Sequence, residues 1–229
     1  MSFRLSYRDD PANPWFSWQY VRDNSDTILA ALREHVSLTG RAVLIAMLVA
    51  LPLAVVAYWF RSLTGPILAL SGVLYTIPSL ALFAFVAPYL GTGVVTVLVG
   101  LVLYALLLII RNAVAGLNQV PPEVREAAEG MGYGRFGRLF RIDLPLALPG
   151  ILTGLRLATV STVALVTVGV LVGHGGLGQL IFAGFQNNFY KAQILTGTVL
   201  CVLLALVLDL LLAGVGRLLT PWATSRGAR

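Results

Sequence analysis

Charged residues are scarce in this chain, and their scarcity decides its class. Only 11% of the 229 residues are Asp, Glu, Lys or Arg, whereas 58% are hydrophobic. A soluble domain typically carries about 25% charged residues. The stretch 62–110 contains no charged residue at all, and about 20 apolar residues suffice for a helix to cross a bilayer. The composition therefore excludes an ordinary soluble domain and indicates an integral membrane protein.

Cysteine, lysine and histidine are nearly missing as well. The single Cys201 cannot form a disulfide within the chain. The only lysine, Lys191, is followed by alanine, so the chain has no Walker A sequence, which needs Gly-Lys-Ser/Thr. The two histidines, His35 and His174, have no ligand-like neighbours in the sequence, and no metal site is predicted. No Ser/His/Asp constellation appears either, so we do not expect an enzyme.

Uncharged runs predict an all-α membrane protein with about five transmembrane helices. The runs are 42–60, two within 62–110, one from about Leu146 through 157–190, and 192–216, which only Asp209 interrupts. The predicted transmembrane domain covers 37–216, with an N-terminal region 1–36 and a C-terminal tail 217–229.

Arginines predict the orientation of these helices. The loop 111–145 carries five arginines, and short basic loops favour the cytoplasmic side. With five spans, region 1–36 then lies on the extracytoplasmic side of the membrane and tail 217–229 lies in the cytoplasm. The basic residues behind the net charge of +6 lie at the ends of the spans. The charge therefore does not indicate nucleic-acid binding.

Two local features precede and interrupt the first spans. Ile28, Leu29, Leu32 and Val36 share one helical face, which predicts an amphipathic helix lying on the outer membrane surface. The alternative is an outward extension of the first span. Pro78 lies within the second span and predicts a kink, which either lines a translocation path or serves packing alone.

The most specific motif lies in the loop 111–145. Pro121 and Pro122 predict the start of a short helix, and Gly130 and Gly132 its end. The small Ala127–Ala128 face of this helix is suited to a partner's groove. The spaced elements are Glu126, Ala127, Ala128, Gly132, Ile142, Leu144 and Pro145.

This spacing resembles the EAA loop of the permease subunits of bacterial binding-protein-dependent ABC importers. The resemblance implies a type I importer permease fold in the bacterial inner membrane, with the short helix acting as the cytoplasmic coupling helix. It also implies three protein partners: a cytoplasmic ABC ATPase dimer that binds ATP and Mg²⁺, a second permease subunit (the same chain or a paralogue), and an extracytoplasmic solute-binding protein. This chain itself would bind no cofactor.

Other segments resemble osmoprotectant permeases in particular. They are 76–82, 103–107 with 110–112, 144–149, and the glycine-rich turn Gly173–Gly178, which a short apolar helix over 180–185 follows. The resemblance implies a solute such as glycine betaine, choline or carnitine; another small polar solute, such as an amino acid, is the alternative. The alternative from a different functional class is an ATP-independent channel or secondary transporter. That function would leave the loop motif unexplained.

Aromatic faces are the natural partners of a quaternary ammonium group. The candidates for the substrate path are Tyr75, Pro78, Phe83, Phe85 and Tyr104. For each aromatic side chain the alternative is core packing or contact with lipid.

Two charges fall within predicted spans. Arg156 and Asp209 lie at similar depths, about 15 and 12 Å from the cytoplasmic ends of two consecutive antiparallel spans at a 1.5 Å rise per residue. Because charges in a bilayer usually find a partner, we expect an ion pair. The alternative is that Arg156 extends to the cytoplasmic surface while Asp209 faces a wet subunit interface.

Overall fold

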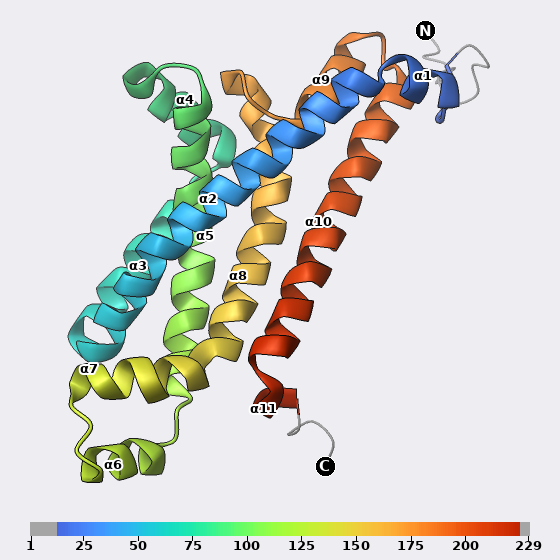
Figure 1. Ribbon diagram of the computed structural model, residues 1–229. Coiled ribbons are helices and arrows are strands. Elements are labelled where there is room, and N and C mark those ends of the chain that lie inside the picture. Colours follow the sequence, from blue (N-terminus) through green and yellow to red (C-terminus); the bar gives the residue numbers. More distant parts are fainter. Residues whose placement is uncertain (1–12, 225–229) are drawn as a thin grey trace, which may run out of the picture.

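A computed structural model describes residues 13–224 of the chain, and helices are the only regular structure within that range (Figure 1). The elements are α1 (Trp18–Asp23), α2 (Ser25–Trp59), α3 (Arg61–Thr76), α4 (Ser79–Leu90), α5 (Val94–Asn118), α6 (Pro122–Gly130), α7 (Arg135–Arg138), the π-turn η1 (Leu139–Asp143), α8 (Leu144–Val166), the 3₁₀-turn η2 (Thr167–Val172), α9 (Leu177–Gln186), α10 (Lys191–Leu219) and α11 (Pro221–Thr224).

Four helical stretches are long and apolar enough to cross a membrane: α2, α5, the run from α7 to η2, and α10. A fifth span requires α3 and α4 together, and these two helices meet at a bend of 95°. The all-α class and the count of up to five spans are therefore confirmed. The second span differs from the prediction because it is broken rather than merely kinked.

Proline chemistry explains this break. Pro78 has no N–H to donate and disfavours the helical conformation at the residue before it, and Ile77 is accordingly extended, with φ −63° and ψ 126°. The carbonyl of Ile77 accepts a hydrogen bond from the hydroxyl of Tyr104 on α5. The break is thus braced from a neighbouring helix, as a polar backbone group inside a membrane requires.

Helix α2 is continuous from Ser25 to Trp59. Its 35 residues span about 52 Å at 1.5 Å per residue, well beyond the roughly 30 Å of a hydrocarbon core. The predicted separate interfacial helix is therefore wrong, and the alternative, an extension of the first span, describes residues 26–36. The boundary drawn at residue 36 coincides with no break. At the other end of the chain, α10 runs three residues past the boundary at 216.

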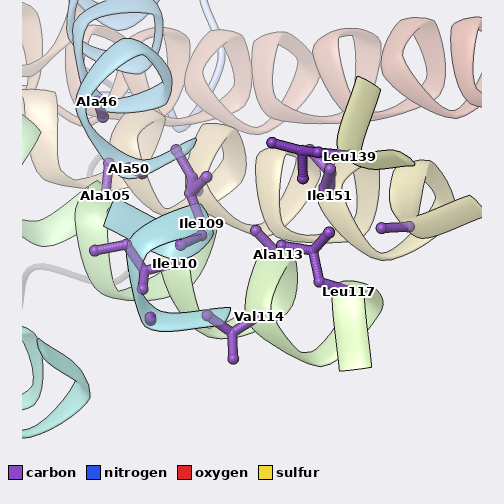
Figure 2. Packing of buried hydrophobic residues seen from close by; sticks show 14 residues of the cluster. Ala46, Ala50, Ala105, Ile109, Ile110, Ala113, Val114, Leu117, Leu139 and Ile151 are labelled. Carbon is purple, nitrogen blue, oxygen red and sulfur yellow. The ribbon is translucent and has the colours of Figure 1, made fainter. Parts of the chain in front are cut away.

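Small residues let α2 lie close to α5. Ala46, Ala50, Ala54 and Ala57 recur along one face of α2, and each is at most 1% exposed. They pack in one cluster with Ala105, Ile109, Ile110, Ala113, Val114 and Leu117 of α5 (Figure 2). Such stripes allow the close backbone approach on which helix packing in membranes depends.

The α5–α8 contact is closer still. A side chain added at Gly150 of α8 would lie 2.9 Å from the Cα of Gly116 on α5. By contrast, α10 leans against the bundle through α8 and α9 and presents leucines outward, among them Leu210 at 66% exposure (Figure 1). An exposed apolar face of this kind is typical of contact with lipid or with another subunit.

The bundle has two ends, which we call the α6 end and the α9 end. At the α6 end, α7 lies across the bundle and α6 lies beyond it, away from the spans (Figure 1). Helix α5 continues to Asn118, past the predicted boundary near Arg111. At the α9 end lie α1, α4, α9 and the glycine-rich turn. The helices predicted over 122–130 and 180–185 are both present, as α6 and within α9.

Candidate functional site: the loop between α5 and α8

The loop that joins α5 to α8, residues 119–143, is built around helix α6. Pro122 occupies the first turn of α6, where its missing N–H costs nothing. At the other end Gly132 has φ +84°. Its N–H bonds the carbonyl of Glu129 (2.9 Å), and the N–H of Tyr133 bonds the carbonyl of Ala128 (3.1 Å). This is a Schellman ending, which needs a left-handed residue at that position, and it gives the motif's glycine a physical role.

The two alanines of the motif face opposite ways. Ala127 is exposed, but Ala128 is fully buried, with 0% exposure. The prediction that both alanines offer a small face to a partner is therefore wrong for Ala128, whose side chain packs inside this chain. The exposed apolar face of α6 consists instead of Val124, Ala127 and Met131, the last 69% exposed. Their spacing of i, i+3 and i+7 is the helical signal that identifies this face.

The second half of the motif forms the entry to α8. Leu144 begins α8 and packs against the α2–α5 cluster, and Pro145 lies in the first helical turn. Ile142 is partly buried in the preceding π-turn η1. These three residues thus anchor the loop to the bundle, whereas Glu126 and Ala127 remain exposed on its far side.

A charged cluster, which the sequence analysis missed, joins the loop to the bundle. Asp143 is 0% exposed. Its Oδ2 accepts hydrogen bonds from the hydroxyl of Tyr58 on α2 (3.2 Å) and from Nε of Arg138 on α7 (3.3 Å). Arg138 also forms an ion pair with Glu129 of α6. An acidic residue just before the apolar start of a span was the available signal, because such a residue needs partners if it is buried.

Two further arginines fix the loop to the helix ends. A terminal nitrogen of Arg125 donates to the carbonyl of Leu117 at the end of α5 (2.9 Å), and its guanidinium lies 5.2 Å from the centre of the Tyr58 ring. The guanidinium of Arg135 lies 4.5 Å from the centre of the Trp59 ring. Such cation–π contacts contribute about 0.5–1 kcal/mol at exposed sites. Arg125 and Arg135 therefore bind the loop to the ends of α2 and α5 at the α6 end of the bundle.

The predicted path residues separate into two groups. Phe83 is 2% exposed and packs on Gly100 of α5, and Tyr104 is 6% exposed, with its hydroxyl engaged by Ile77. The prediction that these two line a path is wrong for this structure, because core packing holds both. Tyr75 and Phe85 are 38% and 69% exposed.

Exposed aromatic side chains lie on both helices that flank the break between α3 and α4. Pro78 is itself exposed. The Tyr75 ring packs edge-on against Tyr104 at 5.7 Å. Phe85 lies 5.8 Å from Tyr89, which is 76% exposed and which the sequence analysis did not consider. The aromatic faces open to a ligand are therefore those of Tyr75, Phe85 and Tyr89.

Arg156 and Asp209 form the expected ion pair. Nε and Nη2 of Arg156 each lie 2.8 Å from one oxygen of Asp209, a bidentate geometry. Matching depth on antiparallel helices was the signal, and α8 and α10 do bring the two side chains together. Their side chains are 39% and 29% exposed in the single chain. Arg156 lines a shallow pocket of about 310 Å³ between α8 and α10.

At the α9 end the glycine-rich turn packs on α2. Nδ1 of His174 in this turn lies 2.8 Å from Oε1 of Glu34 on α2. Within residues 13–224, no group of three or more His, Cys, Asp or Glu side chains is arranged to hold a metal ion.

Comparison with known proteins places these features in one family. The model of the family "Binding-protein-dependent transport system inner membrane component" matches residues 42–225. A choline transport system permease protein of Bacillus subtilis is 35% identical over 91% of this chain and 95% of its own length. An osmoprotectant import permease protein of Salmonella typhimurium is 34% identical, over 88% and 96%. A carnitine transport permease protein of Listeria monocytogenes is 32% identical, over 90% and 93%.

A solved structure shares the fold. A chain of a methionine ABC transporter in an inward-facing conformation superposes with a TM-score of 0.76, covering 84% of this chain and 96% of its own. Its sequence is 22% identical, so the likeness concerns the fold alone.

Proposed function

Because this chain belongs to the family of binding-protein-dependent transport system inner membrane components, we propose that it carries a quaternary-ammonium osmoprotectant such as glycine betaine, choline or carnitine. Family membership itself makes the chain a multi-pass membrane protein and the permease subunit of an ABC importer. The ATPase and the solute-binding protein of such an importer are separate partners, and this chain is not the enzyme.

The observation that supports the solute class is the agreement among relatives. Three proteins that align with about nine tenths of this chain are named for choline, osmoprotectant or carnitine transport. The exposed rings of Tyr75, Phe85 and Tyr89 fit the same class, since a quaternary ammonium group has no N–H to donate and binds to aromatic faces. Tyr75 lies at the end of α3, next to the break, whereas Phe85 and Tyr89 lie further along α4. A bend in a span can border a path.

Uptake by the assembled importer tests the solute. The permease, its ATPase and its binding protein are reconstituted in proteoliposomes, and uptake of labelled glycine betaine, choline and carnitine is compared with that of methionine and proline. We expect ATP-dependent uptake of at least one quaternary amine and none of the two amino acids. Uptake of an amino acid alone would overturn the assignment, and uptake without ATP would favour a channel or secondary transporter.

For coupling, the proposal assigns the exposed face of α6 to the ATPase. Val124, Ala127 and Met131 present an apolar strip that a groove on an ATPase can cover. Each of two permease subunits would present one such helix to an ATPase dimer that holds ATP and Mg²⁺. Closing of that dimer would rock the permeases between inward and outward access, and the binding protein would deliver solute at the α9 end.

Replacing Ala127 with tryptophan tests the docking face. The bulky ring should prevent the ATPase from copurifying with the permease while membrane insertion stays normal. Val43→Trp, on a span and outside the strip, is the control for added bulk. If the Ala127→Trp permease still copurifies with its ATPase and transports normally, the strip is not the docking face.

The same proposal places the α6 end in the cytoplasm and the N-terminal region outside. Gln19 in α1 and Gln119 beside α6 lie at opposite ends of the bundle and are both exposed (Figure 1). Each is changed to cysteine with Cys201 replaced by serine, and cells are treated with a membrane-impermeant thiol reagent. Gln19→Cys should react in intact cells and Gln119→Cys only after permeabilisation, and the reverse pattern would invert the topology.

A further inference from the structure

The Asp143 cluster, which we define as Tyr58, Arg125, Glu129, Arg138 and Asp143, links every part of the loop to the bundle. Glu129 belongs to α6, Arg138 to α7, Asp143 to η1 and Tyr58 to the end of α2. Contacts run without interruption from Glu129 through Arg138 and Asp143 to Tyr58. Arg125 of α6 also contacts the Tyr58 ring directly, so α6 reaches the end of α2 by two side-chain routes that meet at Tyr58.

The π-turn η1 makes the central contact possible. Arg138 and Asp143 are five residues apart, whereas an α-helix brings residues three or four apart onto one face. In η1 the N–H of Leu144 bonds the carbonyl of Leu139, the i→i+5 pattern of a π-turn, which places residues five apart above one another. A regular helix over the same residues would point the two charges away from each other. Single π-turns of this kind occur frequently at functional sites.

The cluster is not saturated with hydrogen bonds. Across residues 13–224, four buried side-chain polar atoms have no partner. Two belong to the cluster, Asp143 Oδ1 and Arg125 Nε, and a third, Trp59 Nε1, belongs to the residue after Tyr58. Buried polar groups in folded proteins are nearly always paired. A spare acceptor on Asp143 and a spare donor on Arg125, on either side of Tyr58, give the cluster the capacity for a second hydrogen-bonded arrangement.

We propose that Asp143 is the positioning residue of energy coupling: through Arg138 and Glu129 it fixes α6 relative to α2 and α8, so that a displacement of α6 moves the transmembrane helices with it. The inference rests on the proposed docking of an ATPase on α6. Without Asp143 the ATPase would still bind α6 and hydrolyse ATP. The displacement of α6 would no longer be transmitted to the transmembrane helices.

The decisive measurement is solute uptake per ATP hydrolysed by the complete importer in proteoliposomes. Asp143→Asn keeps the shape of the side chain and removes its charge. We expect this ratio to fall by about tenfold, within the usual range of coupling between sites, while ATP hydrolysis and ATPase copurification stay within about twofold of the unaltered importer. Asp143→Glu, which keeps the charge, should recover part of the ratio.

Arg141→Gln is the matched control. Arg141 lies in the same π-turn, carries the same charge as Arg138 and is exposed, with no ion pair to another described residue. Its replacement should leave the ratio unchanged, whereas Arg138→Gln should lower it. Equal losses for Arg138→Gln and Arg141→Gln would show that only the charge of the loop matters and would overturn the proposal.

Peripheral variants keep the test decisive if Asp143→Asn fails to assemble. Glu129→Ala and Tyr58→Phe each remove one contact of the relay, and the side chain of Glu129 is 60% exposed, so its replacement leaves the core intact. Both should lower uptake per ATP. A normal ratio in both variants would overturn the proposal whatever Asp143→Asn does.

A distance measurement separates positioning from docking. With Cys201 replaced by serine, spin labels are placed at Glu123→Cys on α6 and Arg111→Cys on α5, both exposed positions. We expect Asp143→Asn to broaden the distance distribution while the ATPase still copurifies; an unchanged distribution would count against positioning. If instead Ala127→Trp leaves assembly intact, the docking proposal fails, and that result is independent of the distance.

Discussion

Helix α2 is bound to a distant loop at each of its ends, and the two attachments differ in kind. At the α9 end, His35 is fully buried and uses both ring nitrogens. Its Nδ1 accepts from the N–H of Leu177 (3.2 Å), so Nε2 carries the proton that is donated to the carbonyl of Val163 (3.0 Å). At the α6 end, Asp143 and Arg125 each keep an unused polar atom.

The two ends also differ in how closely their glycines are packed. An added Cβ at Gly176 would lie 2.6 Å from the Cβ of His35, whereas one at Gly132 would meet nothing within 4 Å. A close-packed contact whose polar atoms are all hydrogen-bonded resists rearrangement, because close-packed protein interiors transmit strain. We therefore regard the α9 end of α2 as a clamp and the α6 end as the less tightly fixed attachment.

The largest expected effect breaks the clamp. Gly176→Ala introduces a side chain at φ +51° and against the backbone of His35. Overpacking typically costs about 1–3 kcal/mol and the unfavourable backbone conformation about 1–2 more. Thermal unfolding of the detergent-solubilised permease should show a severe loss of stability or no folded protein. Gly40→Ala is the control, because a Cβ there meets nothing within 4 Å; equal stability of the two variants would contradict the clamp.

A loss of comparable size should follow when His35 is changed to leucine. The N–H of Leu177 and the carbonyl of Val163 then lose their partner, and each unsatisfied buried group costs about 1–3 kcal/mol. Glu34→Gln, which keeps an acceptor for His174, should cost less than about 1 kcal/mol, as partly exposed ion pairs do. The free energy of unfolding measures both, and a His35→Leu protein as stable as Glu34→Gln would remove the distinction between the two ends.

At the α6 end a substitution should affect transport more than stability. Gly132→Val places a β-branched residue at φ +84°, at a local cost of about 1–2 kcal/mol, and should misplace α6 and lower uptake. Gly132→Asn should retain most uptake, because asparagine tolerates the left-handed conformation. Gly130→Ala, at an ordinary φ, should be neutral or slightly stabilising. If the Asn and Val variants lose uptake equally, the position is sensitive to the size of any side chain and not to its backbone conformation.

The smallest effect is expected between the two ends, at the Arg156–Asp209 pair. Because this pair is partly exposed in the single chain, Arg156→Gln and Asp209→Asn should each reduce assembly or uptake only moderately. The charge-swapped double variant should recover part of the loss, as a double-mutant cycle requires of a direct interaction. Purely additive losses would show that the two charges act separately.

Local patterns predicted more of the α6 end than of the α9 end. Pro122 and Gly132 act on neighbouring residues, so the limits of α6 followed from the sequence. The orientation of Ala128 did not, because the face that α6 buries depends on where α7 and η1 lie. Asp143 was overlooked since Tyr58 is distant in sequence and Arg138, five residues away, is not at the spacing that a regular helix aligns. The α9 end depends on pairings such as His35 with Leu177, which no local spacing reveals.

The sequence by itself determined the class, the number of spans, the limits of helix α6 and the matching depth of Arg156 and Asp209, because each depends on composition, on neighbouring residues or on rise per residue along one helix. Only the tertiary structure decided that Pro78 breaks its span by 95°, that Phe83 and Tyr104 belong to the core, that α2 continues outward without a joint, and that a π-turn aligns Arg138 with Asp143. Those outcomes depend on which helices lie side by side, and the free energy of those contacts is set by residues far apart in the chain.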